Sequence, residues 1–415
     1  MSHDQRLTAA ATPAAHDTAP LGFAEFVSLV AALMALTALG IDSMLPALPA
    51  IAASLHVVTE NDRQLVISAF LIGFGVAQLV HGPLADRYGR KPVLALALLA
   101  YVIANVIAAF SGSFTLLLLA RFVSGTAIAA SRVVTVALVR DCFSGRAMAR
   151  VMSLAFMVFM AAPILAPGFG QAVLLVGSWR LIFGGIALVS ALVLLWFAWR
   201  MPETLDPADQ LPLSPRRIAR GWWLALTDRW SIGYTLATTA LMGPLYGFIN
   251  SVQQIVSEVL GAEHLLVFIF AGSALTMAAA NLMNSRIVMA VGMRRISHTA
   301  LVTLIGVSAL HLLIAVSGHE TLASFVILQS IAMGCFGLAT ANFGAMAMEN
   351  MGAIAGTASS VQGFISVTAG AVLGALIGRA FDGTTVPLYV GFLIAGLAAL
   401  GIVLVIERGR LFRAS

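Results

Sequence analysis

The stretch Gly82-Pro83-Leu84-Ala85-Asp86-Arg87-Tyr88-Gly89-Arg90-Lys91 lies between two long apolar runs, at about residues 64–83 and 92–110. Its ten residues include two glycines, one aspartate and three basic side chains. Each flanking run is close to the length of about 20 apolar residues that a helix needs to cross the hydrocarbon layer of a membrane. A dense charge cluster between two such runs predicts a tight loop at a membrane surface.

The composition of the whole chain agrees with a membrane protein. Of its 415 residues, 60% are hydrophobic and only 10% are charged, whereas soluble domains average about 45–50% and about 25%. We infer that a lipid bilayer surrounds most of the chain. The net charge of +5 does not indicate a nucleic-acid partner, because nearly all 23 basic residues fall in short connections between apolar runs.

Twelve apolar runs are long enough to span a membrane as helices. They lie at about residues 23–48, 64–83, 92–110, 114–138, 148–174, 180–199, 230–253, 264–289, 296–317, 320–344, 352–378 and 385–406. The first run is longer than the roughly 7–15 residues of a signal-peptide core, so we expect it to remain as the first membrane helix. The sequence therefore predicts an all-α membrane protein with twelve transmembrane helices.

The longest connection, residues 200–229, divides these helices into two halves of six, at residues 23–199 and 230–406. We expect residues 200–229 to be a cytoplasmic linker. We also expect a disordered cytoplasmic segment at residues 1–22 and a cytoplasmic tail at residues 407–415.

A weak internal repeat supports this division. Gly82 and Gly89 are seven residues apart, and basic residues follow directly. Ser285 and Gly292 have the same spacing at the same place in the second half and are again followed by basic residues, although this second copy lacks the acidic residue. Two pseudo-symmetric six-helix halves, with a site between them near the midplane, are the architecture that such repeats indicate.

The basic residues also predict the orientation. If both termini are cytoplasmic, the cytoplasmic segments hold 18 lysines and arginines and the opposite segments hold three. Cytoplasmic connections of membrane proteins are enriched in these residues. We therefore predict that both termini face the cytoplasm.

The loop at residues 82–91 has residues suited to a mechanical role. Gly82 and Gly89 permit close backbone approach and left-handed turns. Asp86 is placed to accept hydrogen bonds from the start of the next helix and to pair with Arg90. Asp141, at the cytoplasmic end of the fourth run, is a second candidate partner for Arg90. The alternative is a loop whose charges only fix its orientation in the membrane.

Two arginines lie inside the fourth run, where a buried cation costs at least about 2.5–3.5 kcal/mol. Arg121 and Arg132 are eleven residues apart, which places them only about 20° apart around a helix. We expect both to face a cavity or a partner on the same side. Arg132 lies nearer the cytoplasmic end, so it either lines the substrate cavity or extends to the membrane surface.

Asp42 is the only acidic residue well inside a run. Counting about 1.5 Å per residue, it lies at a depth similar to that of Arg121, so the two could meet. Burial favours the neutral form of a carboxylate and an adjacent arginine favours its charged form. A motion that makes and breaks this pair would therefore let Asp42 carry a proton. The alternative is an aspartate that ends its helix before Pro46 and stays hydrated.

Helix-bending residues and amides complete the candidate sites. Because Pro removes a backbone donor and Gly permits tight packing, the fifth run is predicted to bend at the interface between the halves, at Pro163, Pro167, Gly168 and Gly170. Amides of the second half either line the substrate cavity or bond neighbouring helices; they are Asn250, Gln253, Gln254, Gln329 and Gln362. Cys142 and Cys335 have neither disulfide nor metal spacing, so we expect free thiols and no metal site.

Several stretches resemble the major facilitator superfamily, and within it the twelve-span Bcr/CflA branch of drug:proton antiporters. The resemblance runs from about residue 23 to about residue 407. It rests on Asp42 with Leu45-Pro46-Ala47-Leu48-Pro49, on Gly82–Lys91, Val139-Arg140-Asp141 and Pro163–Gly170, on Trp179-Arg180-Leu181-Ile182-Phe183, and on Gly356–Phe364. Ser124 departs from the family's Arg-x-x-Gln-Gly pattern, in which Gln is usual. The fifth run reads Ala-Pro and Gly-Phe-Gly where the antiporter signature reads Gly-Pro-x-x-Gly-Gly.

The resemblance implies that the first and fourth helices of each half line a cavity, and that the loop at residues 82–91 is a latch that holds one conformation. It implies a monomer in a bacterial inner membrane that exports small hydrophobic or amphipathic compounds in exchange for protons. The proton gradient drives such transport without a cofactor. The sequence contains no Gly-x-x-x-x-Gly-Lys-Ser/Thr loop for nucleotide binding.

Two other functions remain open on the residues. A proton-independent facilitator or a metabolite importer or exporter would use the same fold. An intramembrane enzyme or a sensor would need reactive groups within the runs, and we find no paired carboxylates, metal spacing or Ser/His arrangement there. His311 stands alone in the ninth run. We therefore predict that the protein is not an enzyme.

Overall fold

The computed structural model describes residues 21–143, 145–207, 210, 214–351 and 354–412, with only the backbone for parts of residues 145–164 and for residue 217. The prediction for residues 1–22 thus lies almost entirely outside the described residues. Within them, long helices and short helical segments make up nearly the whole chain and no strand occurs. The predicted all-α architecture is confirmed.

The N-terminal half contains six long helices: α1 (Phe23–Asp42), α3 (Leu65–Tyr88), α4 (Arg90–Ala109), α5 (Phe114–Cys142), α6 (Gly145–Val176) and α7 (Arg180–Arg200). Helix α1 stops at Asp42, before the end of the apolar run at residue 48. Pro46 has no N–H group to continue the helix, and proline also disfavours helical geometry in the residue before it. The chain continues as η1 (Leu45–Ala47), α2 (Leu48–Ser54) and η2 (Glu60–Gln64).

The C-terminal half contains another six: α9 (Arg229–Gln254), α10 (Leu266–Val291), α11 (Met293–Val316), α12 (Leu322–Ala347), α13 (Ala355–Arg379) and α14 (Val386–Ile406). One π-helical turn, η4 (Ile255–Val259), and η5 (Glu263–Leu265) join α9 to α10. Within the predicted linker, α8 (Pro215–Thr227) forms a further helix that packs on α13 and α9. Its proline occupies the first helical position, where a missing N–H costs nothing.

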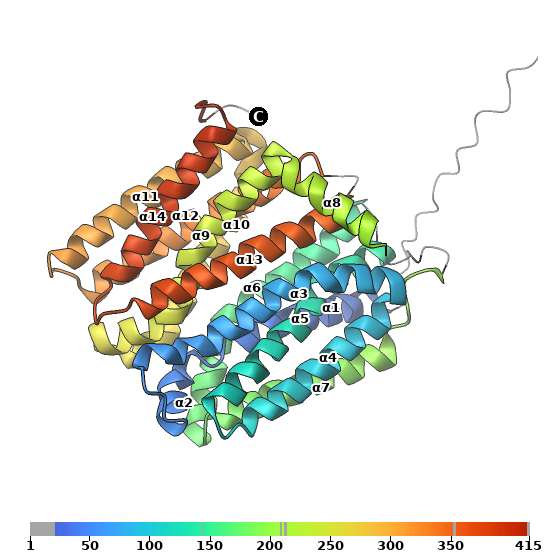
Figure 1. Ribbon diagram of the computed structural model, residues 1–415, viewed down its shortest axis with the longest axis horizontal. Helices are drawn as coiled ribbons and strands as arrows, with labels where there is room; N and C mark the ends of the chain where they lie inside the picture. Colours follow the sequence, from blue (N-terminus) through green and yellow to red (C-terminus); the bar gives the residue numbers. More distant parts are fainter. Residues whose placement is uncertain (1–20, 144, 208–209, 211–213, 352–353, 413–415) are drawn as a thin grey trace, which may run out of the picture.

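Ten helical segments of the described residues are long and apolar enough to cross a membrane. The other two predicted spans correspond to α6 and α9, which are 32 and 26 residues long. Figure 1 shows the two groups of six side by side, with α8 across one end. We call this end of the bundle the α8 end, and the opposite end, which carries α2 and η2, the η2 end.

Helices α3 and α13 lie side by side at the boundary between the halves (Figure 1). A Cβ atom on Gly75 would lie 2.3 Å from Thr368 Oγ1 and 2.8 Å from its backbone nitrogen, and one on Gly363 would lie 2.1 Å from Gln78 Oε1. Glycine at these positions therefore allows the two helices to approach closely. Helices α6 and α10 make the second contact between the halves.

The repeated spacing in the sequence corresponds to a repeated backbone geometry. Gly89 joins α3 to α4 with φ +98° and ψ 156°, and Gly292 joins α10 to α11 with φ +89° and ψ 146°. Other residues rarely adopt this conformation, so glycine is required at both tight turns.

Candidate functional site

Arg121 is completely buried at the centre of the N-terminal half. Its Nε donates to the carbonyl oxygen of Val66 at 3.1 Å and its Nη2 to that of Gly40 at 2.8 Å. The guanidinium also lies 4.3 Å from the centroid of the Phe70 ring. Among the described residues Nη1 has no hydrogen-bond partner. Carbonyl dipoles and an aromatic face thus stabilise this cation.

The position of Arg121 follows from the end of α1. Gly40 is one of the last four residues of the helix, whose carbonyls have no partner within it. The C-terminal end of a helix also carries partial negative charge, which favours a nearby cation. Arg121 therefore caps α1 from the side. A Cβ atom at Gly40 would lie 2.3 Å from Tyr101 Oη, so only glycine fits here.

Asp42 is the last residue of α1 and is only 5% exposed. The ion pair with Arg121 that matching depth predicted is not formed in this structure. Arg121 binds the backbone two residues earlier instead. Among the described residues, the Asp42 carboxylate makes no hydrogen bond or ion pair. It therefore ends its helix, as the alternative interpretation held, but it is buried rather than hydrated.

Arg132 behaves differently from Arg121, although both lie on the same side of α5. Arg132 is exposed. Its place in the substrate cavity stays a prediction.

Polar residues join the two halves at the η2 end. We name this group the polar clasp. Its contacts are the ion pairs of Arg63 with Glu258 and of Asp62 with Arg379 at 2.7 Å, and hydrogen bonds from Asn61 to the backbone oxygens of Arg379 and Phe381, from Gln64 to Gln254, from Gln254 to Asn61 and from Asn250 to Ser68. Every one of these contacts crosses from the N-terminal to the C-terminal half.

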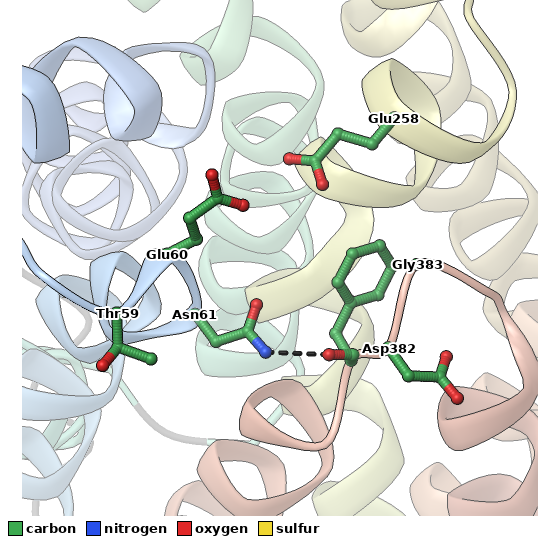
Figure 2. Close-up of a pocket in the computed structure, with 7 residues that line it drawn as sticks. Thr59, Glu60, Asn61, Glu258, Asp382 and Gly383 are labelled. Atoms are coloured by element: carbon green, nitrogen blue, oxygen red, sulfur yellow. Dashed lines mark hydrogen bonds between the residues drawn. The ribbon is translucent and has the colours of Figure 1, made fainter.

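A shallow pocket of about 350 Å³ opens beside the polar clasp. Figure 2 shows Asn61 reaching to the backbone oxygen of Phe381, with Glu258 and Glu60 around the same space. Its lining is mainly acidic and polar.

The five candidate amides divide between this clasp and helix packing. Asn250 and Gln254 belong to the polar clasp, and Gln253 donates to Ser257 one turn later. Gln329 is fully buried within the C-terminal half and accepts from Tyr389 at 3.1 Å. Gln362 donates to Ser231 and to the backbone of Ala347.

The bend residues of α6 lie in a continuous helix. A Cβ atom at Gly170 would lie 1.8 Å from the carbonyl oxygen of Ser43, so α6 touches the end of α1 there. Gly168 faces Val267 of α10 in the other half. Pro163 and Pro167 do not interrupt the helix, and the side chain of Pro163 lies outside the described residues.

The loop at the α8 end carries the predicted ion pairs. Arg90 donates to Asp86 at 2.5 Å and to Asp141 at 3.0 Å. The sequence analysis missed Glu203, whose carboxylate accepts from the backbone N–H groups of Arg90 and Lys91 at 2.9 and 3.0 Å. This caps the start of α4, the role expected of Asp86. The sequence does place Glu203 in a connection at the same membrane surface, which was the available signal for this contact.

His311 does not stand alone, as the sequence suggested. Its Nε2 lies 2.8 Å from Glu320, and Thr385 donates to the other oxygen of that carboxylate. The ring stacks on Tyr389 with centroids 3.6 Å apart. This cluster ties α11, α12 and α14 together, away from the boundary between the halves. The described residues contain no group of three metal-binding side chains.

Comparison with known proteins identifies the family. A sequence model described as Major Facilitator Superfamily matches residues 30–378. The chain is 30% identical over 369 residues to a protein of Haemophilus influenzae named bicyclomycin resistance protein homolog, covering 88% of this chain and 91% of that protein. It is 31% identical over 232 residues to the multidrug resistance protein MdtL of Escherichia coli, covering 56% and 58%.

The fold also matches solved structures. The peptide transporter POT in complex with sulfate superimposes with a TM-score of 0.74 at 15% identity, covering 93% of this chain and 95% of the other. At this identity the likeness concerns the fold.

Proposed function

Because the chain belongs to the major facilitator superfamily, we propose that this multi-pass secondary transporter exports hydrophobic or amphipathic small molecules in exchange for protons. The two relatives named for drug resistance support export of drugs. The stretches that resemble the Bcr/CflA branch support the same assignment. Family membership itself makes the chain a transporter rather than an enzyme.

In this proposal the α8 end faces a bacterial cytoplasm, both termini lie on that side, and the protein is a monomer of the inner membrane. The excess of basic residues at the α8 end supports the orientation. The bacterial relatives support the compartment.

The observation that carries the proposal is the isolation of Asp42. The twelve long helices hold only three other carboxylates, Glu25, Asp86 and Asp141, and each of these pairs with an arginine at the α8 end. Asp42 alone is buried without such a partner among the described residues. Binding a proton removes the cost of burying its charge, so Asp42 is the natural proton carrier of the bundle.

The geometry gives the exchange a physical route. Asp42 lies at the end of α1 nearest the polar clasp, where opening would bring it into contact with water outside. Arg121 holds the end of α1 through Gly40, so it is assigned a positioning role in this step. With the polar clasp closed, a solute enters from the α8 end. In this proposal the ion pairs of Arg90 with Asp86 and Asp141 form a latch at that end, which holds one conformation and breaks when the halves move.

Proton release on addition of substrate tests the proposal. The purified protein is reconstituted in liposomes containing a pH-sensitive dye and given a panel of lipophilic antibiotics and dyes. We expect the wild type to move protons with at least one compound. Asp42→Asn should abolish this movement while substrate binding survives, whereas Glu25→Gln, on the same helix but at the α8 end, should retain it.

Unchanged proton movement in Asp42→Asn would leave exchange in place and reject Asp42 as the carrier. Transport by the wild type that ignores the pH gradient would favour the alternative, a facilitator or a metabolite transporter on the same fold.

A further inference from the structure

Helix α8 lies across the ends of the long helices (Figure 1), so it runs along the membrane surface instead of through the membrane. Its thirteen residues contain three arginines, two tryptophans and no acidic residue. A helix that carries arginines on one face and tryptophan on another is typical of segments that lie in the interface between lipid and water. The structure shows which residues of α8 face the protein and which face away from it.

One face of α8 packs on the C-terminal half. A Cβ atom built on Gly221 would lie 2.8 Å from Thr357 Cγ2 of α13. Ala225, one turn later, is only 2% exposed and forms a small buried cluster with Met351 and Ala358. These contacts fix the rotation of α8 about its own axis, and they leave its other faces without a protein partner among the described residues.

The faces that point away from the protein separate apolar from basic side chains. Ala219, Trp223 and Leu226 are spaced by four and three residues, so they lie along one stripe of the helix. All three are exposed, Trp223 by 68%. Arg216 and Arg220, four residues apart, form a second exposed stripe. At about 100° per residue, the apolar stripe lies between the packed face and the two arginines.

This order of faces matches the layers of a membrane surface. The apolar stripe is suited to the ends of the acyl chains, and tryptophan is enriched at that level. The two guanidinium groups then reach the phosphate layer, where arginine binds phosphate oxygens through paired hydrogen bonds. A second copy of the chain fits this face poorly. A twofold contact through it would oppose arginines to arginines, because α8 has no acidic residue.

We propose that the exposed face of α8 is a binding surface for anionic phospholipids, with Arg216 and Arg220 holding the headgroup and Trp223 lying beside the acyl chains. Zwitterionic lipids carry the same phosphate together with an ammonium group, so net charge selects between the two classes. Because α8 packs on α13 and α9, bound lipid attaches the C-terminal half to the membrane surface. This surface does not depend on which solute the protein transports.

Quenching of tryptophan fluorescence by brominated lipids tests the surface. The protein is reconstituted in phosphatidylcholine nanodiscs in which a small fraction of the lipid is brominated on its acyl chains, either as phosphatidylglycerol or as phosphatidylcholine. The chain has 6 tryptophans, so each variant is compared with the same variant carrying Trp223→Leu, and the difference is the emission of Trp223.

Brominated phosphatidylglycerol should quench Trp223 at least about twofold more than brominated phosphatidylcholine does, since an arginine near a membrane surface strengthens the attraction of anionic lipid by up to about fivefold. This excess should disappear in Arg216→Gln/Arg220→Gln and decrease at high salt, which screens exposed charges. The matched control is Arg408→Gln/Arg410→Gln, which removes two exposed arginines that follow α14 at the same end of the bundle. It should retain the excess.

Equal quenching by the two lipids in the wild type, or an excess that survives in Arg216→Gln/Arg220→Gln, would overturn the proposal. Emission of Trp223 that neither lipid quenches would also overturn it. In that case a dimer mass of the purified protein would assign the face to a second copy, and a monomer mass would place the face in water. The measurement uses neither substrate nor a proton gradient, so its outcome is independent of the proposed transport function.

Discussion

The polar clasp makes a quantitative prediction about which end of the bundle opens. Arg63 is only 7% exposed, and its guanidinium pairs with the carboxylate of Glu258. The Nε atom of Arg63 has no hydrogen-bond partner among the described residues. Replacing Glu258 with Gln leaves the guanidinium buried with a weaker partner. Such a loss costs about 1–3 kcal/mol, which changes the ratio of closed to open forms by about 5- to 150-fold.

The pair of Asp62 and Arg379 contributes less. The two side chains are 24% and 54% exposed, and exposed ion pairs contribute about 0–1 kcal/mol. We therefore expect Glu258→Gln to open the η2 end more than Asp62→Asn does. High salt should weaken mainly the exposed pair, because screening acts least on buried charges.

Distances between spin labels measure this opening. Labels on cysteines introduced at Val58, which is 99% exposed, and at Glu263, which is also exposed, report the separation of the halves at the η2 end. In Glu258→Gln the fraction of molecules with the longer distance between the two labels should increase, and the fraction with the shorter distance should decrease. Glu60→Gln is the control, since Glu60 lines the same pocket without an ion pair among the described residues. An unchanged distribution in Glu258→Gln, or an equal shift in Glu60→Gln, would refute the reasoning.

Two further predictions concern stability, measured by thermal unfolding in detergent. Gly170→Ala should destabilise the protein strongly, because the added Cβ would lie 1.8 Å from the backbone oxygen of Ser43. Gly184→Ala should be neutral, because no atom lies within 4 Å of a Cβ at that position. Similar melting temperatures of the two variants would contradict the packing of α6 on α1. Glu320→Gln should lower the free energy of unfolding by about 1–3 kcal/mol, because it weakens the hydrogen-bond partner of the fully buried His311. Glu349 is exposed and serves as the control. A loss of stability in Glu320→Gln no larger than that in Glu349→Gln would show that the cluster around His311 contributes little.

Ion pairs between residues near one another at the membrane surface could be predicted from the sequence. Hydrogen bonds from a side chain to the backbone of another helix could not. Arg90 and Asp86 are four residues apart across one turn, and Asp141 ends a helix at the same surface, so their meeting follows from topology. The pairing of Asp42 with Arg121 failed because equal depth says nothing about direction around a helix. It also says nothing about which carbonyls a helix leaves free where it ends.

Long-range partners were invisible for a related reason. Glu203 caps α4 from 112 residues away, between α7 and α8, and no spacing rule relates the two. Gln254 was identified as a polar residue near the end of a span, but its place in the polar clasp depends on η2, a segment whose sequence has no membrane-spanning pattern. Such contacts become apparent only when the halves are seen together.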